Sequence, residues 1–361
     1  MSVLPASPSE VRSPTAFVGP LWDGVARVVD RMERLDDLRE HRLQLVAAAR
    51  LRERGRTVPS ELADEARAST LAALAVPVLL TRMRAACSGP LVLFKGAEAA
   101  LSYPTPTLRP YLDVDVLVPD AAAAEQELLA AGFTPVGEDR DYTNEHHRRP
   151  LAHPDVPISV EVHAHPKWVR GLGDPPVELV FSRTVPSSMG VEGVAAPSPA
   201  MHAVLLAAHA WAERPLGRLG DILDVAALSA RAPDGEAAAL AHDVGIGRIW
   251  DATTAAARAV FLDGRRTWPL RTWARHLAEA RGRTVLESHL ARLLTPFAML
   301  PPGAALPAAS RAAAQTLRRS EAEPWGAKLA RSRRAVGHAR MGRSEHEDHL
   351  QGGRERGGGG A

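Results

Sequence analysis

The sequence contains little cysteine, few aromatic residues and almost no lysine. Its single cysteine, Cys87, cannot form an intramolecular disulfide, which is typical of proteins kept in a reducing cytosol. We therefore expect a cytoplasmic protein. Aromatic residues make up 4% of the chain against a hydrophobic fraction of 45%, so the core should consist mainly of Ala, Leu and Val.

Targeting signals and an excess of one charge are also missing. Residues 1–10 lack the basic and apolar regions of a signal peptide. The longest apolar stretches fall short of about 18 residues and carry charges, so we predict no membrane span and no membrane partner. The net charge of +2 argues against a protein built mainly to coat nucleic acid. At 361 residues the chain can hold two domains.

The scarcity of lysine gives weight to the lysines that remain. Of 44 basic residues only Lys95, Lys167 and Lys328 are lysines, and the bias toward Arg and Ala is typical of GC-rich coding. A lysine kept beside a glycine, as in Lys95-Gly96, is therefore more apt than average to have a function, although chance retention is the alternative.

The most informative stretch runs from residue 91 to residue 118. A strand pattern at 91–94 ends at Lys95-Gly96, and a helical pattern and a second strand at 112–118 follow. Asp113 and Asp115 lie two residues apart, so both carboxylates project from one face of that strand. Leu112, Val114, Val116 and Val118 should point to the other face, into a core. Two like charges on one face favour a divalent cation between them, and hard oxygen ligands suit Mg²⁺.

This stretch resembles the DNA polymerase beta superfamily of nucleotidyltransferases. It is most similar to an uncharacterised bacterial family with Lys-Gly in place of Gly-Ser, followed by Arg-Pro-x-x-Asp-x-Asp. The resemblance is specific across 91–118 and continuous from about 25 to 230. It implies an α/β (α+β) fold in which a mixed sheet is flanked by N-terminal and C-terminal helical segments. It also implies that the two aspartates hold Mg²⁺ and that a third acid lies on a nearby strand.

Glu161 is the best candidate for that third acid. It alternates with Ile158, Val160 and Val162 in a strand at 158–163, on the polar face. The resemblance therefore assigns the catalytic and metal-binding roles to Asp113, Asp115 and Glu161, with Glu161 taking the acceptor's proton. The alternatives are a solvated strand face for the aspartates and a surface ion pair for Glu161.

Three residues near the aspartates are candidates for binding nucleotide. Gly96 would let the backbone approach phosphate, and the alternative is an ordinary strand–helix turn. Lys95 would reach the triphosphate, or would neutralise the aspartates in the empty enzyme. Arg109 would contact phosphate or lock its loop.

Three further residues are candidates for a substrate pocket. His163 would orient Glu161 or touch substrate. His209 and Asp224 belong to a pattern seen in the resembled family, and they would line the acceptor or nucleobase pocket or form a buried contact between helices. A zinc site built from the histidines between 146 and 165 is disfavoured, because no cysteine joins them and the spacing fits no closed site.

The remaining segments were assigned from periodicity and composition. The predicted order is disorder at 1–14, a helical segment at 15–88, a catalytic core at 89–185, a helical domain at 196–300, and at 301–361 a basic Ala/Arg-rich segment followed by a flexible Gly-rich tail. Within the second segment Pro77 should kink or split a helix.

Taken together, the sequence predicts a cytoplasmic Mg²⁺-dependent nucleotidyltransferase that moves a nucleoside monophosphate from an NTP such as ATP to an acceptor. The acceptor would be a small molecule, a peptide or, less favoured, RNA. One rival is a non-catalytic nucleotide- or peptide-binding accessory protein that retains the fold. A second is a glycosyltransferase with an Asp-x-Asp motif, which the position of the motif within a strand disfavours.

Overall fold

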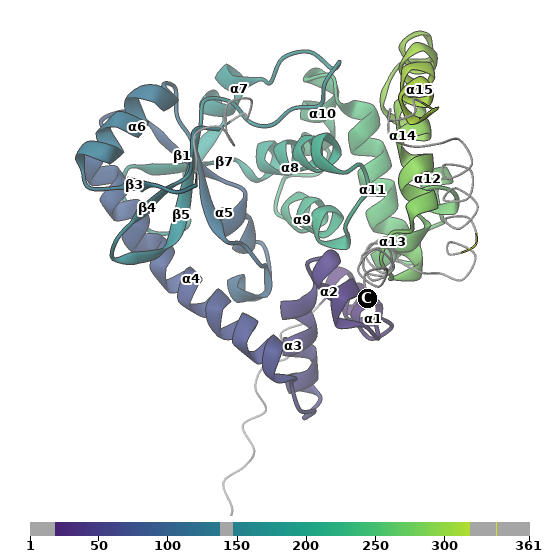
Figure 1. Cartoon of the computed structure of the whole chain (residues 1–361), viewed down its shortest axis with the longest axis horizontal. Coiled ribbons are helices and arrows are strands. Elements are labelled where there is room, and N and C mark those ends of the chain that lie inside the picture. The colour runs from purple at the N-terminus through teal and green to yellow at the C-terminus, as the bar shows by residue number, and fades with distance from the viewer. Residues whose placement is uncertain (1–18, 138–146, 318–336, 338–361) are drawn as a thin grey trace, which may run out of the picture.

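A mixed sheet of seven strands and a group of helices lie side by side in the computed structural model, which describes residues 19–137, 147–317 and 337 (Figure 1). The strands lie in the order β3, β4, β5, β2, β1, β7, β6. Their bounds are β1 (Leu91–Phe94), β2 (Asp113–Leu117), β3 (Thr134–Pro135), β4 (Leu151–His153), β5 (Val156–His163), β6 (Thr184–Pro186) and β7 (Val194–Pro197). At the centre of the sheet, β1 is antiparallel to β2, whereas β2 is parallel to β5.

The helices fall into three groups along the chain. Four precede the sheet: α1 (Pro20–Val29), α2 (Leu35–Glu40), α3 (Gln44–Glu53) and α4 (Ser60–Ala86). Short helices connect the strands: α5 (Gly96–Ala100), η1 (Pro106–Leu108), α6 (Ala121–Ala130) and α7 (Val177–Ser182). The rest follow the sheet: α8 (Pro199–Glu213), α9 (Leu219–Ser229), α10 (Glu236–Asp243), α11 (Gly247–Phe261), α12 (Trp268–Arg271), α13 (Arg275–Glu279), α14 (Val285–Met299) and α15 (Pro302–Leu317). This confirms the predicted fold class of a mixed sheet flanked by helical segments on both sides in sequence.

Each face of the sheet has its own hydrophobic core. One face packs against α4 and α6 through residues such as Leu80, Val114 and Leu128, which are fully buried. The other face, which carries Phe94 and Leu117, packs toward α8 and α9. Because Asp115 pairs in register with Phe94, its carboxylate lies on this second face, toward the C-terminal helices.

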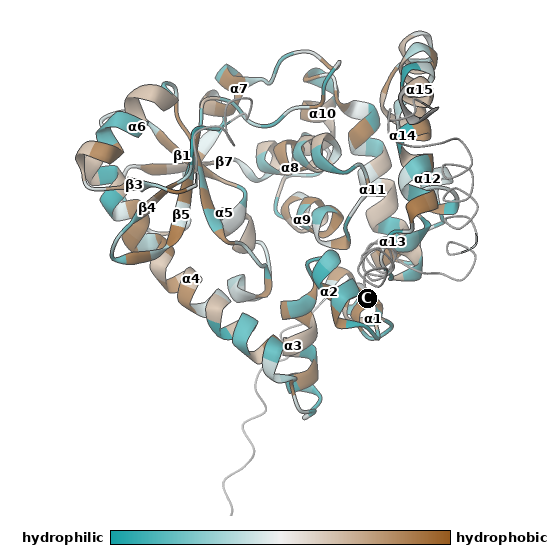
Figure 2. Cartoon of the chain, in the orientation of Figure 1, coloured by the Kyte–Doolittle hydropathy of each residue, from teal (hydrophilic) through white to brown (hydrophobic). Residues whose placement is uncertain are grey.

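α4 is a continuous helix of 27 residues, so of the two predicted effects of Pro77, a kink or a split, the split does not occur. The residues around Pro77, including Val76 and Leu79, are fully buried against the sheet, and this packing outweighs the missing backbone donor. In Figure 2 the half of α4 beside the sheet is more hydrophobic than the half that reaches α3. By length and composition alone α4 could cross a membrane, although it packs against β5 and α6 here.

Other differences from the sequence prediction are local. The first half of the helical segment predicted at 15–88 forms three separate helices, α1, α2 and α3. The sheet continues past the predicted core boundary at 185, because β6 and β7 also join it; both are short, and each ends in proline, so they carry no alternation that would predict a strand. Leu112 is 89% exposed rather than in the core, since β2 begins one residue later. The predictions for residues 1–14 and for the basic and Gly-rich segment beyond 317 lie outside the described residues.

Candidate active site

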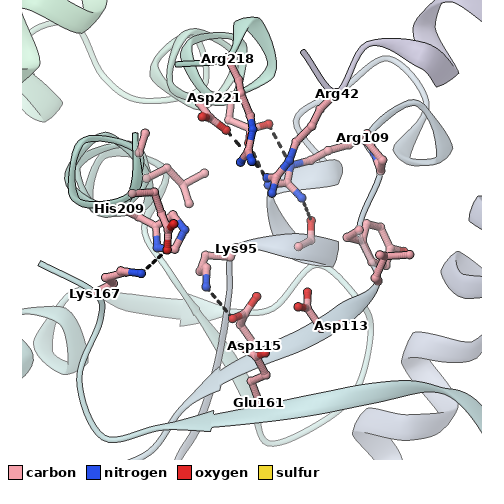
Figure 3. Close-up of a pocket in the computed structure, with 18 of the residues that line it drawn as sticks. Arg42, Lys95, Arg109, Asp113, Asp115, Glu161, Lys167, His209, Arg218 and Asp221 are labelled. Carbon is pink, nitrogen blue, oxygen red and sulfur yellow. Dashed lines mark hydrogen bonds and ion pairs between the residues drawn. The ribbon is translucent and has the colours of Figure 1, made fainter. Parts of the chain in front are cut away.

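Three carboxylates lie together on the face of β2 and β5 that is turned toward the helices (Figure 3). The two strands are parallel with Asp115 in register with Glu161, and Asp113 lies two residues before Asp115 on the same face. All three line a cavity of about 700 Å³ whose opposite wall comes from α2, the α2–α3 turn, α8 and α9. The strand pairing therefore brings together the three acids that the sequence singled out.

The carboxylates are electrostatically unequal. Burial, reinforced by the charges of Asp115 and Glu161, raises the pKa of Asp113 to about 6. Burial also opposes ionisation of Asp115, but the Lys95 ammonium and His163 outweigh it and lower the pKa of Asp115. The site thus holds one firmly ionised carboxylate and a neighbour whose ionisation is resisted, which is the situation that a bound cation relieves.

Lys95 neutralises Asp115 from an unusual backbone conformation. Its φ of 61° and ψ of −145° fall in a region that almost only glycine adopts. The backbone N–H of Lys95 donates to His202 Nε2 at 3.0 Å, and the ammonium lies 2.7 Å from Asp115 Oδ1. Burial lowers the pKa of His202 to about 3, so its imidazole is neutral and can accept. The arrangement aims the lysine at the aspartate, as one of the two sequence alternatives proposed.

His163 lies behind the carboxylates rather than in the cavity. It is fully buried, its Nε2 lies 2.9 Å from Asp115 Oδ1 and 3.6 Å from Glu161 Oε2, and its ring meets Phe94 edge-on. Its position is that of an orienting group and not of a substrate contact. His147 approaches Glu161 at 3.7 Å, whereas His153 lies elsewhere beside Arg82. His147 and His163 thus lie together, with ring centroids 5.2 Å apart, whereas His153 lies apart from them, and His146 lies outside the described residues.

Arg109 locks the loop between η1 and β2. Its guanidinium is buried and donates from Nε and Nη2 to the two carboxylate oxygens of Asp224, at 2.9 and 2.8 Å. Nη1 donates to the carbonyl of Gly96 at 3.1 Å, and Tyr103 donates to Asp224 at 2.7 Å. Burial opposes the charge of Arg109, but Asp224 outweighs it and raises the pKa of the arginine. Both residues touch the cavity, but their polar atoms are committed to each other.

Gly96 sits where the backbone of β2 passes closely. A Cβ at this position would lie 3.1 Å from the carbonyl oxygen of Asp113, so the absence of a side chain serves the packing of α5 on β2. His209, from α8, does line the cavity, beside Lys167 and Glu213, which form an ion pair with each other. Of the nine predicted site residues, all but His163 therefore line one cavity.

A basic wall, formed by Arg42 and Arg218, lies opposite the carboxylates. Arg42, from the α2–α3 turn, and Arg218, just before α9, face the cavity together with Asp221 (Figure 3). Arg42 Nη1 lies 3.8 Å from Asp221 Oδ1. Arg218 belongs to the same family pattern as His209 and Asp224, with the same two alternative roles, whereas no local motif marks Arg42. Residues 176 positions apart give no signal of contact in a single sequence.

The residues present fit a divalent metal. Ligand atoms of Asp115, Glu161 and His163 lie within 4.8 Å of one another, and Asp113 adds a carboxylate on the same face. Oxygen donors of this kind suit Mg²⁺, and a bound cation would offset both the burial and the neighbouring charges that raise the pKa of Asp113.

Comparison with known proteins identifies a family that matches most of the chain. The family described as an uncharacterised nucleotidyltransferase matches residues 30–261. That range contains the whole sheet, the three carboxylates and both arginines of the basic wall. No curated protein and no solved structure matches the chain.

Proposed function

The chain belongs to the uncharacterised nucleotidyltransferase family, and on this premise we propose that it is a Mg²⁺-dependent enzyme that transfers a nucleoside monophosphate from an NTP to an acceptor, with release of pyrophosphate. The observation that carries the proposal is the in-register pairing of β2 and β5, which sets Asp113, Asp115 and Glu161 on one cavity floor. Structural surface acids would not need burial, mutual repulsion and a facing cavity.

The residues of the floor have separable roles in this proposal. Asp113, Asp115 and Glu161 would hold the metal, and His163 would fix the orientation of Asp115 through its 2.9 Å contact. The metal would supply charge neutralisation at the phosphates and activation of the attacking oxygen. Glu161, paired in register with Asp115 but outside the Lys95 ion pair, would take the proton of the acceptor hydroxyl.

The cavity also bears on the acceptor and on the nucleotide. A volume of about 700 Å³ is of the size that holds a small molecule or a short peptide end beside a nucleotide. ATP is the substrate to test first. We also propose a cytoplasmic location, because a single cysteine cannot form an intramolecular disulfide.

Release of pyrophosphate is the test. The parent protein, Asp115→Asn and Glu161→Gln would each be incubated with Mg²⁺, each of the four NTPs and cell extract as the source of acceptor. We expect release with the parent, no measurable release with Asp115→Asn, and a loss of about 10²–10⁴-fold with Glu161→Gln at nearly unchanged NTP affinity. Equal rates for the three proteins would refute the assignment.

A second candidate function is a non-catalytic nucleotide-binding accessory protein. The observation in its favour is the Lys95 ammonium, which lies 2.7 Å from Asp115 and so takes up charge that a metal would otherwise compensate. If Lys95 cannot be displaced, the protein would bind nucleotide without turnover, and the same assay would show binding but no pyrophosphate from any NTP.

A further inference from the structure

The two sides of the cavity carry side chains of opposite charge, and some of these side chains lack a close partner of opposite sign. On the floor, Lys95 neutralises Asp115, which leaves Asp113 and Glu161 in excess. On the opposite wall most cations have partners: Arg39 pairs with Glu61 and Glu65, Arg109 with Asp224, and Lys167 with Glu213. Arg42 has only the distant contact with Asp221, and Arg218 feels Asp221 and Glu213 only at longer range, so these two arginines are the least compensated cations of the wall.

Arg218 is the less compensated of the two arginines. Within residues 19–137 and 147–317 its guanidinium has no hydrogen bond and no ion pair within 4.0 Å, although Asp221 acts on it at longer range. Burial, together with the charges of Arg42 and Arg214, lowers the pKa of Arg218. A partly buried guanidinium beside another one is unfavourable unless an anion lies between them.

Arg42 occupies a position where helices usually place glycine. It lies just after the end of α2. The N–H of Leu43 donates to the carbonyl of Leu38 at 2.8 Å, and the N–H of Arg42 donates to the carbonyl of Arg39 at 3.0 Å. These two hydrogen bonds form the turn that ends the helix. In this turn Arg42 has a φ of 57°. Glycine would fit without strain, so the arginine is kept at a cost to stability, which is typical of functional positions.

Hydrogen bonds from buried residues hold the two arginines next to each other. The Gly220 N–H donates to the carbonyl of His41 at 2.9 Å, and the Leu219 N–H donates to His41 Nδ1 at 3.2 Å. His41 immediately precedes Arg42, and Leu219 immediately follows Arg218. A Cβ on Gly220 would lie 2.9 Å from the His41 carbonyl oxygen, so glycine permits this close approach.

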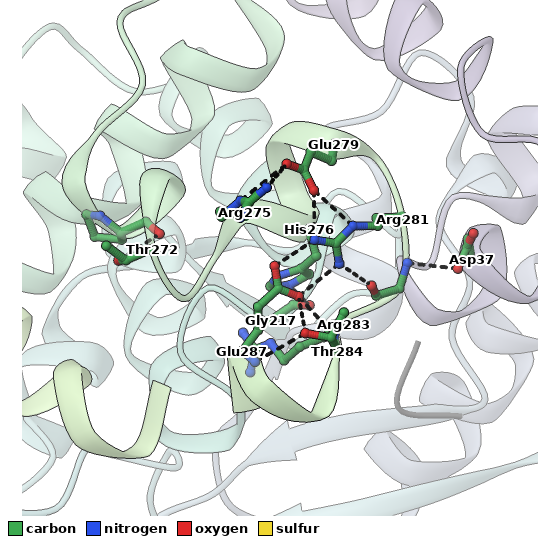
Figure 4. A network of polar contacts seen from close by, with 12 residues as sticks. Asp37, Gly217, Thr272, Arg275, His276, Glu279, Arg281, Arg283, Thr284 and Glu287 are labelled. Carbon is green, nitrogen blue, oxygen red and sulfur yellow. Dashed lines mark hydrogen bonds and ion pairs between the residues drawn. The ribbon is translucent and has the colours of Figure 1, made fainter. Parts of the chain in front are cut away.

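A second layer fixes the loop before Arg218 (Figure 4). Arg283 donates to the carbonyls of Pro215 and Leu216 at 3.0 and 2.7 Å, and His276 Nε2 lies 3.2 Å from the carbonyl of Gly217. Both anchoring residues lie beyond residue 261, where the family match ends. The position of Arg218 is thus fixed in part by residues that the family match does not cover.

From these contacts we propose that Arg42 and Arg218 form an anion clamp that binds the terminal phosphates of an oligophosphate whose other end reaches the carboxylate floor. Planar guanidiniums bind phosphate oxygens in pairs, and two of them match a doubly charged group. The clamp rests on the proposed function only for the molecule that carries the phosphates, which is either the NTP or a phosphorylated acceptor.

Isothermal titration with inorganic tripolyphosphate in the presence of Mg²⁺ tests the clamp without turnover. We expect Arg42→Gln and Arg218→Gln each to weaken binding about tenfold, as for the loss of a charge-assisted hydrogen bond. Arg39→Gln, which changes a cavity arginine that already has two carboxylate partners, should stay within about twofold. Failure of the parent to bind tripolyphosphate, or two glutamine variants within about twofold of the parent, would overturn the clamp.

Arg42→Gly separates a binding role from a structural one. Glycine relieves the positive φ, so the melting temperature should rise while tripolyphosphate binding weakens about tenfold, as in Arg42→Gln. A variant that loses stability and keeps its affinity would assign Arg42 to the fold and remove it from the clamp.

Competition identifies the source of the phosphates. If a non-hydrolysable NTP analogue and tripolyphosphate exclude each other, the clamp takes the nucleotide's own phosphates. If both bind together and only tripolyphosphate binding depends on Arg42 and Arg218, the clamp takes a phosphate of the acceptor. Loss of pyrophosphate release from every NTP with intact tripolyphosphate binding would refute the enzyme activity and keep the clamp.

Discussion

Lys95 and Arg42 place basic side chains in the cavity from backbone conformations that favour glycine. Each costs on the order of 1–3 kcal/mol relative to a relaxed residue. The strained backbone of Lys95 holds its ammonium 2.7 Å from Asp115, and the missing side chain at Gly96 allows close packing of α5 on β2.

Lys95→Met is expected to destabilise the metal-free protein by about 3 kcal/mol, because it leaves the buried Asp115 carboxylate without its partner. Added Mg²⁺ should restore more stability to the variant than to the parent, since the ammonium no longer competes for the carboxylate. Urea unfolding with EDTA or Mg²⁺ measures both effects. Lys167→Met removes a lysine from a more exposed pair with Glu213 and should cost less than about 1 kcal/mol; equal losses for the two variants would contradict the account.

Asp113→Asn should make metal-free stability less dependent on pH. The Asp113 carboxyl ionises near pH 4 in the unfolded chain and at a pKa of about 6 in the folded protein. The folded state therefore keeps a proton that the unfolded state has lost, and stability falls as pH rises from about 4 to 6, by roughly 2–3 kcal/mol. Asparagine removes this fall, so the variant should gain stability over the parent as pH rises to 7.

Unfolding in EDTA at pH 4, 5, 6 and 7 checks the Asp113 prediction. Asp36→Asn, at an exposed position near Arg34, is the matched control and should follow the parent. A constant difference between Asp113→Asn and the parent across this range would show that Asp113 is not held among like charges.

At the scale of elements, the first turn of α9 packs against the turn between α2 and α3. Gly220→Ala would bring a methyl group to 2.9 Å from the His41 carbonyl oxygen and 3.0 Å from Arg42 Cβ. We expect a loss of about 1–3 kcal/mol, as for other overpacked sites, together with weaker tripolyphosphate binding. Gly303→Ala in α15 meets no atom within 4 Å and should be neutral or slightly stabilising. Matching effects at the two glycines would contradict this packing.

The sequence predicted the elements that a local pattern marks. Alternation in β2 and β5 located Asp113, Asp115 and Glu161, and the parallel register then brought them together. A local pattern also marked α6, which ends just before Gly132 with its φ of 92°. β6 and β7 escaped prediction because strands of three and four residues depend on their neighbours in the sheet rather than on periodicity.

The basic wall could not be predicted, because its residues meet only through tertiary contacts. No local pattern distinguishes Arg42 from other residues that follow a helix, and its position beside Arg218 depends on the contacts of His41 with Leu219 and Gly220. The alternatives for Arg109 were decided by Asp224, 115 positions away. Single-sequence reasoning thus located the carboxylates of the floor but not the arginines that face them.

At the scale of the whole molecule, buried histidines connect the end of α2 with α13 and the residues that follow it. His41 and His276 stack at 5.9 Å, and His41 Nε2 lies 2.7 Å from the carbonyl of Arg281. Burial lowers the pKa of His41 to about 4 and also lowers that of His276. Both rings are therefore neutral in the folded protein near neutral pH.

Protonation of these histidines should lower the stability of the folded protein as pH falls. As pH falls from about 6.5 to 4, the unfolded chain binds protons that the folded His41 resists, and stability declines by up to about 3 kcal/mol on this account. His41→Gln should be less stable than the parent at pH 7, with the difference narrowing toward pH 4. The exposed His242→Gln serves as control in the same urea titrations, and a difference independent of pH would place the effect of His41 outside its ionisation.

The cavity as a whole has a polarity that matches a metal–polyphosphate ligand, with Asp113 and Glu161 on the sheet and the weakly paired Arg42 and Arg218 on the opposite wall. The most direct test of this account follows the phosphorus atoms of the NTP. With Mg²⁺ and cell extract, label on the α-phosphorus should move to the acceptor and label on the γ-phosphorus should leave in pyrophosphate, and both should stop in Asp115→Asn. Transfer of the γ-label to the acceptor, or α-label transfer that persists in Asp115→Asn, would contradict the account.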